Sequence, residues 1–152
     1  MKVNPYWVSG FVDGEGTFYV GINHNDSMKS GFQVLPEFRV VQHEKDIKVL
    51  YALKTYFGAG VVRVNHDTRQ ELRIRSLDHI NRYVIPHFDK YPLLTQKKFD
   101  YFKFKEIIKL MNSGQHLTIE GIKHIITIAS RMNRQNKESA PFILEALNSY
   151  HE

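Results

Sequence analysis

Hydrophobic and polar positions follow two different periods along the chain, and each change of period marks a new element. Large apolar residues alternate with small or polar ones over residues 17–23, and this period of two predicts a strand. The segment 24–31 is rich in Asn, Ser and Gly, which favours a loop. A second strand with one apolar face is expected over about 32–42, so the two strands form a hairpin whose polar face stays available to a partner.

A short helix is expected before this hairpin. Asn4 can cap its start, and Pro5 suits the first helical position, where a missing N–H costs nothing. The helix is predicted to end at Val12, because the segment 13–16 reads Asp-Gly-Glu-Gly and two glycines separated by one residue are a strong stop signal.

After residue 45 the chain returns to helical spacing, interrupted by one more pair of short strands. The expected elements are a helix over 46–57, strands over 61–64 and 71–75 around a turn at 66–68, a helix over 77–88, and helices over 96–111, 119–132 and 140–150, with connectors at 89–94, 112–114 and 133–139. This order is α-β-β-α-β-β-α followed by helices. It predicts one α+β domain over 1–152, with a core of about 4–110 and a helical C-terminal extension of about 111–152.

Composition narrows the possible chemistry. The 152 residues include no cysteine, which excludes a disulfide framework, a zinc–thiolate site and a thiol nucleophile. Lys and Arg number 21 against 16 Asp and Glu, and this formal net charge of +5 fits an anionic partner such as nucleic acid. No apolar run reaches the ~18 residues that a membrane span needs, and no targeting peptide is visible, so no membrane partner is expected.

The end of the first helix carries two features that point to chemistry or assembly. Gly10 and Gly14 are four residues apart, with Ser9 beside them, so either two copies of the helix pack closely together or this helix packs closely on its own sheet. Asp13 and Glu15 lie where the helix dipole disfavours negative charge. They are either ordinary acids of a solvated turn or, with the carbonyls of the last turn, hard oxygen ligands for Mg²⁺ or Ca²⁺.

The polar positions of the predicted strands combine arginines with amides and an aromatic residue. Arg recognises guanine and Asn or Gln recognises adenine in the DNA major groove, whereas a merely solvated face more often carries Lys and Glu. Both interpretations remain open for these strands. The candidate DNA contacts are Thr17, Tyr19, Asn23, Asn25, Gln33, Glu37, Arg39, Arg63, Asn65, Arg69, Arg73 and Arg75.

The segment Val8–Gly16 resembles the nine-residue signature of LAGLIDADG homing endonucleases. Gly10 and Asp13 match it outright, as does the final glycine, and the α-β-β-α-β-β-α order follows it. The segments 40–42, 88–97 and 116–123 are similar to the two-motif fungal mitochondrial branch of that family, so the resemblance covers roughly residues 5–135. It implies the homing endonuclease fold, with an antiparallel DNA-binding sheet.

The resemblance also implies roles for individual residues. Glu15 would bind a catalytic divalent metal together with the backbone carbonyl of Gly14, and Gln42 would position water near the metal. Lys97, or Lys98 if the alignment shifts by one residue, would stabilise charge at the scissile phosphate. The expected cofactor is Mg²⁺, and Ca²⁺ is expected to bind without supporting cleavage.

The sequence contains one such signature, so one chain supplies one catalytic acid. Resemblance and stoichiometry together predict a homodimer that pairs through Ser9, Gly10, Asp13 and Gly14, with Asp13 also orienting the helix end. Such a dimer would cleave both strands of a long, near-palindromic DNA site. The chain could equally be one half of a two-motif enzyme.

Two other functions remain compatible with the sequence. One is a nucleic-acid binder of the same fold, either an intron maturase that binds group I intron RNA or a DNA-binding relic that no longer cleaves. The other is a module that dimerises through the glycine helix without binding nucleic acid. By resemblance, an organelle location (mitochondrion or chloroplast) is expected.

Overall fold

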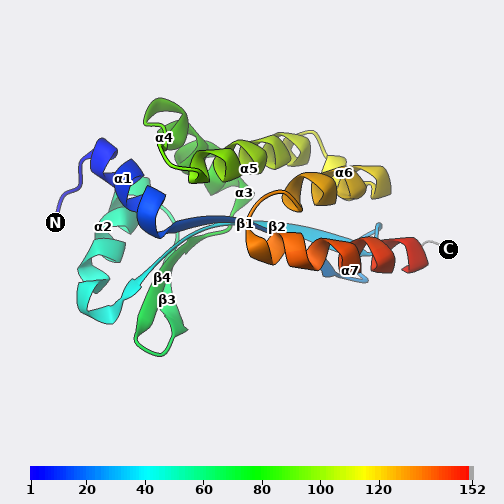
Figure 1. The fold of residues 1–152 in the computed structure, drawn as a ribbon, viewed down its shortest axis with the longest axis horizontal. Helices are drawn as coiled ribbons and strands as arrows, with labels where there is room; N and C mark the ends of the chain where they lie inside the picture. The colour runs from blue at the N-terminus through cyan, green and yellow to red at the C-terminus, as the bar shows by residue number, and fades with distance from the viewer. Residues whose placement is uncertain (151–152) are drawn as a thin grey trace. The chain divides into compact units, whose positions relative to one another are not determined.

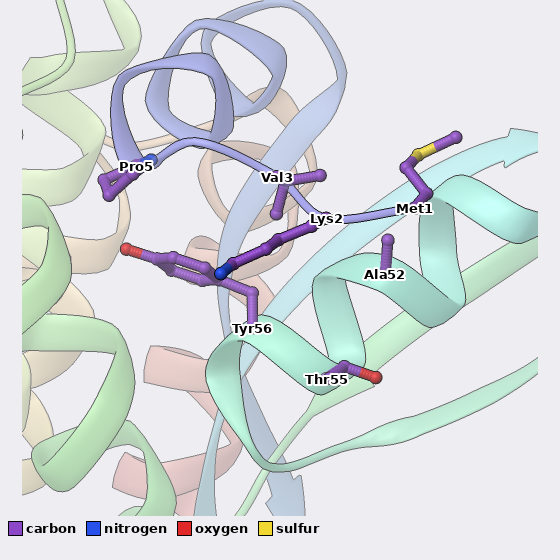
Figure 2. Close-up of a pocket in the computed structure, with 7 residues that line it drawn as sticks. All are labelled: Met1, Lys2, Val3, Pro5, Ala52, Thr55 and Tyr56. Atoms are coloured by element: carbon purple, nitrogen blue, oxygen red, sulfur yellow. The ribbon is translucent and has the colours of Figure 1, made fainter.

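The computed structural model describes residues 1–150, and its elements follow the expected order (Figure 1). These elements are α1 (Pro5–Glu15), β1 (Gly16–His24), β2 (Phe32–His43), the 3₁₀ turn η1 (Glu44–Asp46), α2 (Ile47–Phe57), β3 (Val61–His66), β4 (Arg69–Ile74), α3 (Leu77–His79), the π-helical turn η2 (Ile80–Val84), α4 (Ile85–Lys90), α5 (Lys97–Asn112), the 3₁₀ turn η3 (Gln115–Leu117), α6 (Ile119–Ala129) and α7 (Arg134–Tyr150). The predicted α+β class and element order are therefore confirmed. Within the described part of the chain, no helix combines the length and apolar character needed to cross a membrane.

The strands form one sheet in the order β1-β2-β4-β3. β2 and β4 pair antiparallel with Arg39 opposite Arg73 and Val41 opposite Glu71, and β3 pairs antiparallel with β4. Directly opposed residues point to the same face of a sheet, so the odd-numbered residues of β2 and β4 share one face. That face is polar, as the alternation predicts, while Val40 and Leu72 lie on the apolar face.

The described residues divide into two compact units. The first consists of Met1–Phe18 and Glu37–Lys98, and the second of Tyr19–Pro36 with the described residues from Phe99 onward. The sequence predicts a core of about 4–110 and a helical extension of about 111–152 within one domain, and it does not anticipate that a hairpin segment would group with the C-terminal helices. The single domain over 1–152 stays a prediction.

An aromatic cluster forms the centre of the first unit. The ring centroids of Phe18 and Phe38 are 5.4 Å apart, those of Phe38 and Phe57 are also 5.4 Å apart, and Phe88 lies 5.5 Å from Phe18. All four rings are at most 2% exposed. The Phe38–Phe57 and Phe18–Phe88 pairs pack edge to face. Aromatic packing of this kind contributes about 0.5–1.5 kcal/mol per pair beyond the buried area, so the cluster fixes β1, β2, α2 and α4 of this unit against one another.

The helix α1 is longer than predicted. It runs to Glu15 rather than Val12, and the carbonyl of Val12 accepts the backbone N–H of Gly16. A glycine inside a helix costs about 1 kcal/mol but does not end it, and Gly16 rather than Gly14 is the C-cap. The consequence matters for function, because Glu15 becomes the last residue of the helix.

The region predicted as one helix over 77–88 is divided by the π-helical turn η2. Pro86 follows directly within the first positions of α4, and a proline has no N–H with which to continue the regular i→i−4 ladder. The widened turn therefore precedes the residue that cannot make the normal bond, a feature that hydrophobic spacing does not reveal.

In the second unit, the polar stretch predicted as a connector over 133–139 is the start of α7. The side chain of Asn133 accepts the backbone N–H of Asn136 at 3.1 Å, which caps the helix. Asn136 is buried: its side-chain oxygen accepts the N–H of Val20 at 3.3 Å, and its side-chain amide donates to the Val20 carbonyl. Since β1 is an edge strand, Asn136 satisfies backbone groups that no neighbouring strand pairs.

Candidate functional site

The inner face of α1 is anchored by a chain of buried polar groups. The Ser9 hydroxyl donates to the carbonyl of Tyr91 at 2.6 Å and lies 3.0 Å from Nε2 of His87, while Nδ1 of His87 lies 2.8 Å from the Tyr56 hydroxyl. Because Ser9 gives its hydrogen to Tyr91, Nε2 carries the ring hydrogen and donates to Ser9, and Nδ1 accepts from Tyr56. Burial lowers the pKa of His87 to about 4, so the imidazole is neutral at physiological pH.

This network corrects one part of the predicted dimer surface. Ser9 is 5% exposed and its hydroxyl is used within its own unit, so it lies on the inner face of α1 rather than on the face offered to a second copy. Burial also raises the pKa of Tyr56, and the neighbouring Tyr91 adds to this effect. Spacing along the sequence could not reveal the hydrogen-bond partners, because they come from residues more than forty positions away.

The outer face of α1 has the opposite character. Gly10 and Gly14 are exposed, and a Cβ atom added to either would meet nothing within 4 Å. Trp7 and Phe11 stack beside them with ring centroids 4.9 Å apart, and Trp7 is 42% exposed. The interpretation that these glycines permit close packing on the chain's own sheet is therefore wrong.

The two acids at the end of α1 differ in their surroundings. The Asp13 carboxylate accepts the backbone N–H of Leu94 at 2.9 Å, and it accepts both the N–H and the hydroxyl of Thr95 at 3.2 and 2.6 Å. Asp13 thus attaches the end of α1 to the segment that leads into α5, in agreement with its expected orienting role. Glu15 is exposed at the last helical position.

Lys97, the first residue of α5, contacts the same helix end. Its ammonium nitrogen donates to the carbonyl of Val12 at 3.0 Å, where the negative end of the helix dipole favours a cation. This contact favours Lys97 over Lys98 as the lysine near Glu15. Gln42 on β2 lies opposite Gln70 on β4, and the side-chain oxygen of Gln42 accepts the backbone N–H of His43 at 3.2 Å. The role of Gln42 in positioning water stays a prediction.

The donor set at this helix end suits a hard cation. Glu15 offers a carboxylate and Gly14 a backbone carbonyl, and oxygen donors of these two kinds are the ones that Mg²⁺ and Ca²⁺ prefer. Among the described residues, no group of three or more His, Cys, Asp or Glu side chains is placed to hold a metal. The oxygens of Glu15 and Gly14 fit a metal whose remaining ligands are water or phosphate.

The candidate DNA contacts are distributed over both units. The first unit contains Thr17, Glu37, Arg39, Arg63, Asn65, Arg69, Arg73 and Arg75, and the second contains Tyr19, Asn23, Asn25 and Gln33. Strand register places Arg39, Arg73 and Arg63 on one face of β2, β4 and β3. In the second unit, the Asn25 amide donates to the side-chain oxygen of Gln33 at 3.0 Å.

Glu37 is not the exposed contact that the alternating pattern predicts. Its side chain is 6% exposed, and Arg39, Arg73 and Arg75 lie within ion-pair distance of its carboxylate. Glu71, which the sequence places outward but does not single out, is equally buried and faces Arg63 and Asn65. The sequence offers no signal for this burial, because the register that sets Arg39 opposite Arg73 is known only from the structure.

Comparison with known proteins decides the family. The profile of the LAGLIDADG endonuclease family matches residues 8–108, more than half of the chain. The chain belongs to this family. The LAGLIDADG helix is α1, and the match includes all four strands and the first part of α5.

Individual relatives agree with this assignment. The crystal structure of a homing endonuclease, I-TnaI, is 53% identical and superimposes with a TM-score of 0.94 over 97% of this chain and 99% of that one. I-SmaMI bound to cleaved DNA is 34% identical with a TM-score of 0.86, over 92% of this chain and 48% of that one. A further I-SmaMI structure holds uncleaved target DNA in the presence of calcium ions, at 34% identity, with a TM-score of 0.85 over 92% of this chain and 49% of that one.

A curated relative, probable intron-encoded endonuclease 3 of Neurospora crassa, is 38% identical over 136 residues. The match covers 88% of this chain and 25% of the relative. This chain therefore spans about a quarter of that relative and about half of I-SmaMI.

Proposed function

We propose that this chain is a sequence-specific, Mg²⁺-dependent DNA endonuclease that acts as a homodimer and cleaves both strands of a long, near-palindromic site. The observation that carries the proposal is the end of α1: Glu15 is exposed at the last helical position, and the Lys97 ammonium lies 3.0 Å from the carbonyl of Val12 in the same turn. In a LAGLIDADG endonuclease this is the helix end from which a carboxylate reaches the cleavage site.

Each residue at this helix end would have a separate role in cleavage. Glu15 and the carbonyl of Gly14 would hold a divalent metal, which when bound stabilises charge on the phosphate and provides hydroxide at neutral pH. Lys97 would stabilise the negative charge that develops on the scissile phosphate. Asp13 keeps the helix end and the start of α5 together, and Gln42 would orient the attacking water.

The outer face of α1 supports the proposed homodimer. Two glycines inside one helix cost about 1 kcal/mol each relative to alanine, and nothing within 4 Å of Gly10 or Gly14 requires their small size. A second copy of α1 whose backbone approaches at these positions would account for both. A two-fold interface also supplies a second Glu15, one for each DNA strand, and implies a target with approximate two-fold symmetry.

Double-stranded DNA is the proposed partner. The polar face of β2, β4 and β3 carries four arginines, at positions 39, 63, 69 and 73, and Arg75 follows directly after β4, on a chain of net charge +5. I-SmaMI, which shares this fold, is described as bound to its DNA target. An organelle location belongs to the same proposal, because the N. crassa relative is named as intron-encoded.

A selection from random duplex DNA tests this function. The protein is incubated with a random double-stranded library in Ca²⁺, bound DNA is recovered, and the enriched sequences are then incubated with the protein in Mg²⁺. We expect enrichment of a near-palindromic sequence and its cleavage on both strands in Mg²⁺ but not in Ca²⁺. Binding without cleavage of any enriched sequence in Mg²⁺ would contradict the endonuclease proposal.

The dimer is tested separately by sedimentation of the wild type and of Gly10→Leu. Leucine is a good helix former and position 10 has open space in its own chain, so the variant should keep its fold. We expect a dimer for the wild type and a monomer for Gly10→Leu, with loss of double-strand cleavage. A Gly10→Leu variant that remains dimeric and active would contradict this interface.

A further inference from the structure

Two acidic side chains are buried on the face that the proposed function turns toward DNA. The side chains of Glu37 and Glu71 are each 6% exposed, although they lie on the polar side of β2 and β4. A carboxylate on a DNA-binding face lowers affinity, because it repels the phosphates that supply most of the attraction. General affinity for DNA therefore does not explain why these two acids are there.

Glu37 is the centre of a cluster of three arginines. One carboxylate oxygen lies 3.1 Å from Nη1 of Arg39, and the other lies 3.0 Å from Nε of Arg75 and 3.7 Å from Nε of Arg73. The Arg75 contact is also a hydrogen bond of good geometry. These arginines come from two strands or their ends, so one carboxylate fixes side chains across the β2–β4 pair.

Glu71 forms a second, smaller cluster across the β4–β3 pair. One oxygen lies 3.5 Å from Nε of Arg63, and the other accepts a hydrogen bond from the Asn65 amide at 3.1 Å. Arg63 is directly opposite Glu71 in the strand register. The Arg63 side chain is 49% exposed, so the acid lies beneath a side chain whose outer part reaches solvent.

The contacts made through Nε have a particular consequence for recognition. A guanidinium is a rigid plane with five N–H donors, and a carboxylate at Nε uses one of them and sets the orientation of that plane. Arg75 is 52% exposed beyond its contact with Glu37. Arginine reads guanine through two parallel hydrogen bonds, so a guanidinium held in one orientation discriminates between bases better than one that rotates freely.

The repulsion between the arginines also indicates that Glu37 holds them in fixed orientations. Arg39 and Arg73 are directly opposite each other on neighbouring strands, a placement that is unfavourable for like charges. Without the carboxylate of Glu37, these side chains would separate and sample other rotamers. With it, they are held side by side at 25% and 20% exposure.

We infer that Glu37 and Glu71 are specificity-determining positioning residues, which hold arginines on adjacent strands in fixed orientations so that these read guanine-containing base pairs. The inference rests on the proposed DNA-binding function. It assigns the two acids no contact with DNA. It also predicts that each acid controls its own block of base pairs, Glu37 through Arg39, Arg73 and Arg75, and Glu71 through Arg63 and Asn65.

The test compares base preferences of four proteins selected against the same random duplex DNA library in Ca²⁺. Glu37→Gln and Glu71→Gln remove one charge each from the sheet. Asp78→Asn is the matched control, because it removes one carboxylate from the exposed pair of Asp78 on α3 with Arg82 on η2 and so changes the net charge equally. Thermal unfolding of each variant verifies folding, and Glu37→Asp, which keeps the charge on a shorter side chain, replaces Glu37→Gln if that variant does not fold.

We expect Glu37→Gln to weaken the preference at one block of base pairs by about tenfold, with the other block unchanged, and Glu71→Gln to weaken a different block. Binding to unrelated DNA should be at least as tight as in the wild type, with a steeper salt dependence, and Asp78→Asn should keep the wild-type profile. A uniform loss at all positions, or unchanged profiles in folded variants, would overturn the inference. If the wild type itself enriches no sequence, the proposed function fails instead.

Discussion

The end of α1 and the polar face of β2–β4–β3 both contain acidic side chains in a basic protein, but they use them differently. At the helix end, Glu15 is exposed, while on the sheet Glu37 and Glu71 are buried beneath arginines and an asparagine. A carboxylate that binds a metal ion must be accessible from solvent. A buried carboxylate must instead be paired with charged or hydrogen-bonding side chains of its own chain.

Asp13 shows that neither sequence position nor residue type decides between these two uses. It lies two residues from Glu15 in the same helix turn, yet its carboxylate already accepts three hydrogen bonds from Leu94 and Thr95. The hydrogen-bond and ion-pair partners of each carboxylate therefore distinguish Glu15, the proposed metal ligand, from the acids that position other groups.

The largest effect is expected for Glu15. Glu15→Gln removes the charge that would hold the metal and touches no packing, because the side chain is exposed. We expect cleavage of bound DNA in Mg²⁺ to fall by at least about 10²–10³-fold, the loss typical of removing one charge-stabilising group. Affinity for DNA and the thermal unfolding midpoint should remain close to wild type. Single-turnover cleavage of pre-bound DNA measures the first quantity, and retained cleavage would remove Glu15 from the site.

Lys97 should show the next largest effect. Lys97→Met removes the ammonium that lies 3.0 Å from the Val12 carbonyl. We expect a loss of about 10²-fold in the single-turnover rate, because a cation near the reacting phosphate would be absent. Lys98→Met is the matched control and should stay within about threefold of the wild type. Equal losses in the two variants would show that the helix-end contact does not identify the catalytic lysine.

His87 tests the buried anchor at the opposite face of α1. Its pKa is about 4 in the folded protein and near 6.5 when exposed, so the unfolded chain binds more protons between these values. Stability should therefore fall as the pH decreases through this window, by about 1.6 kcal/mol between pH 6.5 and 5 from this group alone. Urea unfolding at several pH values measures it. His87→Gln should lack this component, and identical slopes for both proteins would contradict the buried neutral imidazole.

Asp13 should give the smallest effect, and one on stability. Asp13→Ala removes three hydrogen bonds that attach α1 to the segment before α5. We expect a loss of about 1–2 kcal/mol in the free energy of unfolding. Asp78→Ala, which breaks only an exposed ion pair with Arg82, should cost at most about 0.5 kcal/mol. If the two substitutions cost the same, Asp13 does not fix the helix end.

Much of the fold follows from local signals in the sequence. Alternation over β1 and β2 predicts the buried apolar residues Phe18, Val20, Phe38 and Val40, because one face of a sheet packs on the core and every second side chain points there. Asn4 and Pro5 start α1 as their chemistry predicts. The turn at 66–68 is also found, and Asp67 within it adopts a positive φ of 51°.

The errors share a physical cause: they depend on partners that are distant in the sequence. The sequence predicts that Asn136 is a linker residue, and only its two hydrogen bonds to the Val20 backbone show its structural role. The sequence places Ser9 on the same surface of α1 as Gly10 and Gly14, and only the contacts with His87 and Tyr91 show that it is buried. Glu37 has the pattern of an exposed strand residue, and only the pairing of β2 with β4 brings Arg73 and, just after β4, Arg75 to it. Periodicity reports which face a residue occupies, and it does not report what covers that face.

One measurement tests the division of the acids most directly: a crystal structure of the protein with its selected duplex DNA and Ca²⁺. We expect a Ca²⁺ ion about 2.3–2.6 Å from a Glu15 carboxylate oxygen and from the Gly14 carbonyl. We also expect that Arg75 meets a base edge while Glu37 stays behind it without touching DNA. A Ca²⁺ ion bound elsewhere with Glu15 turned away from it would contradict the role of Glu15 as the metal ligand. Direct contact of Glu37 with a base would contradict its role as a positioning residue.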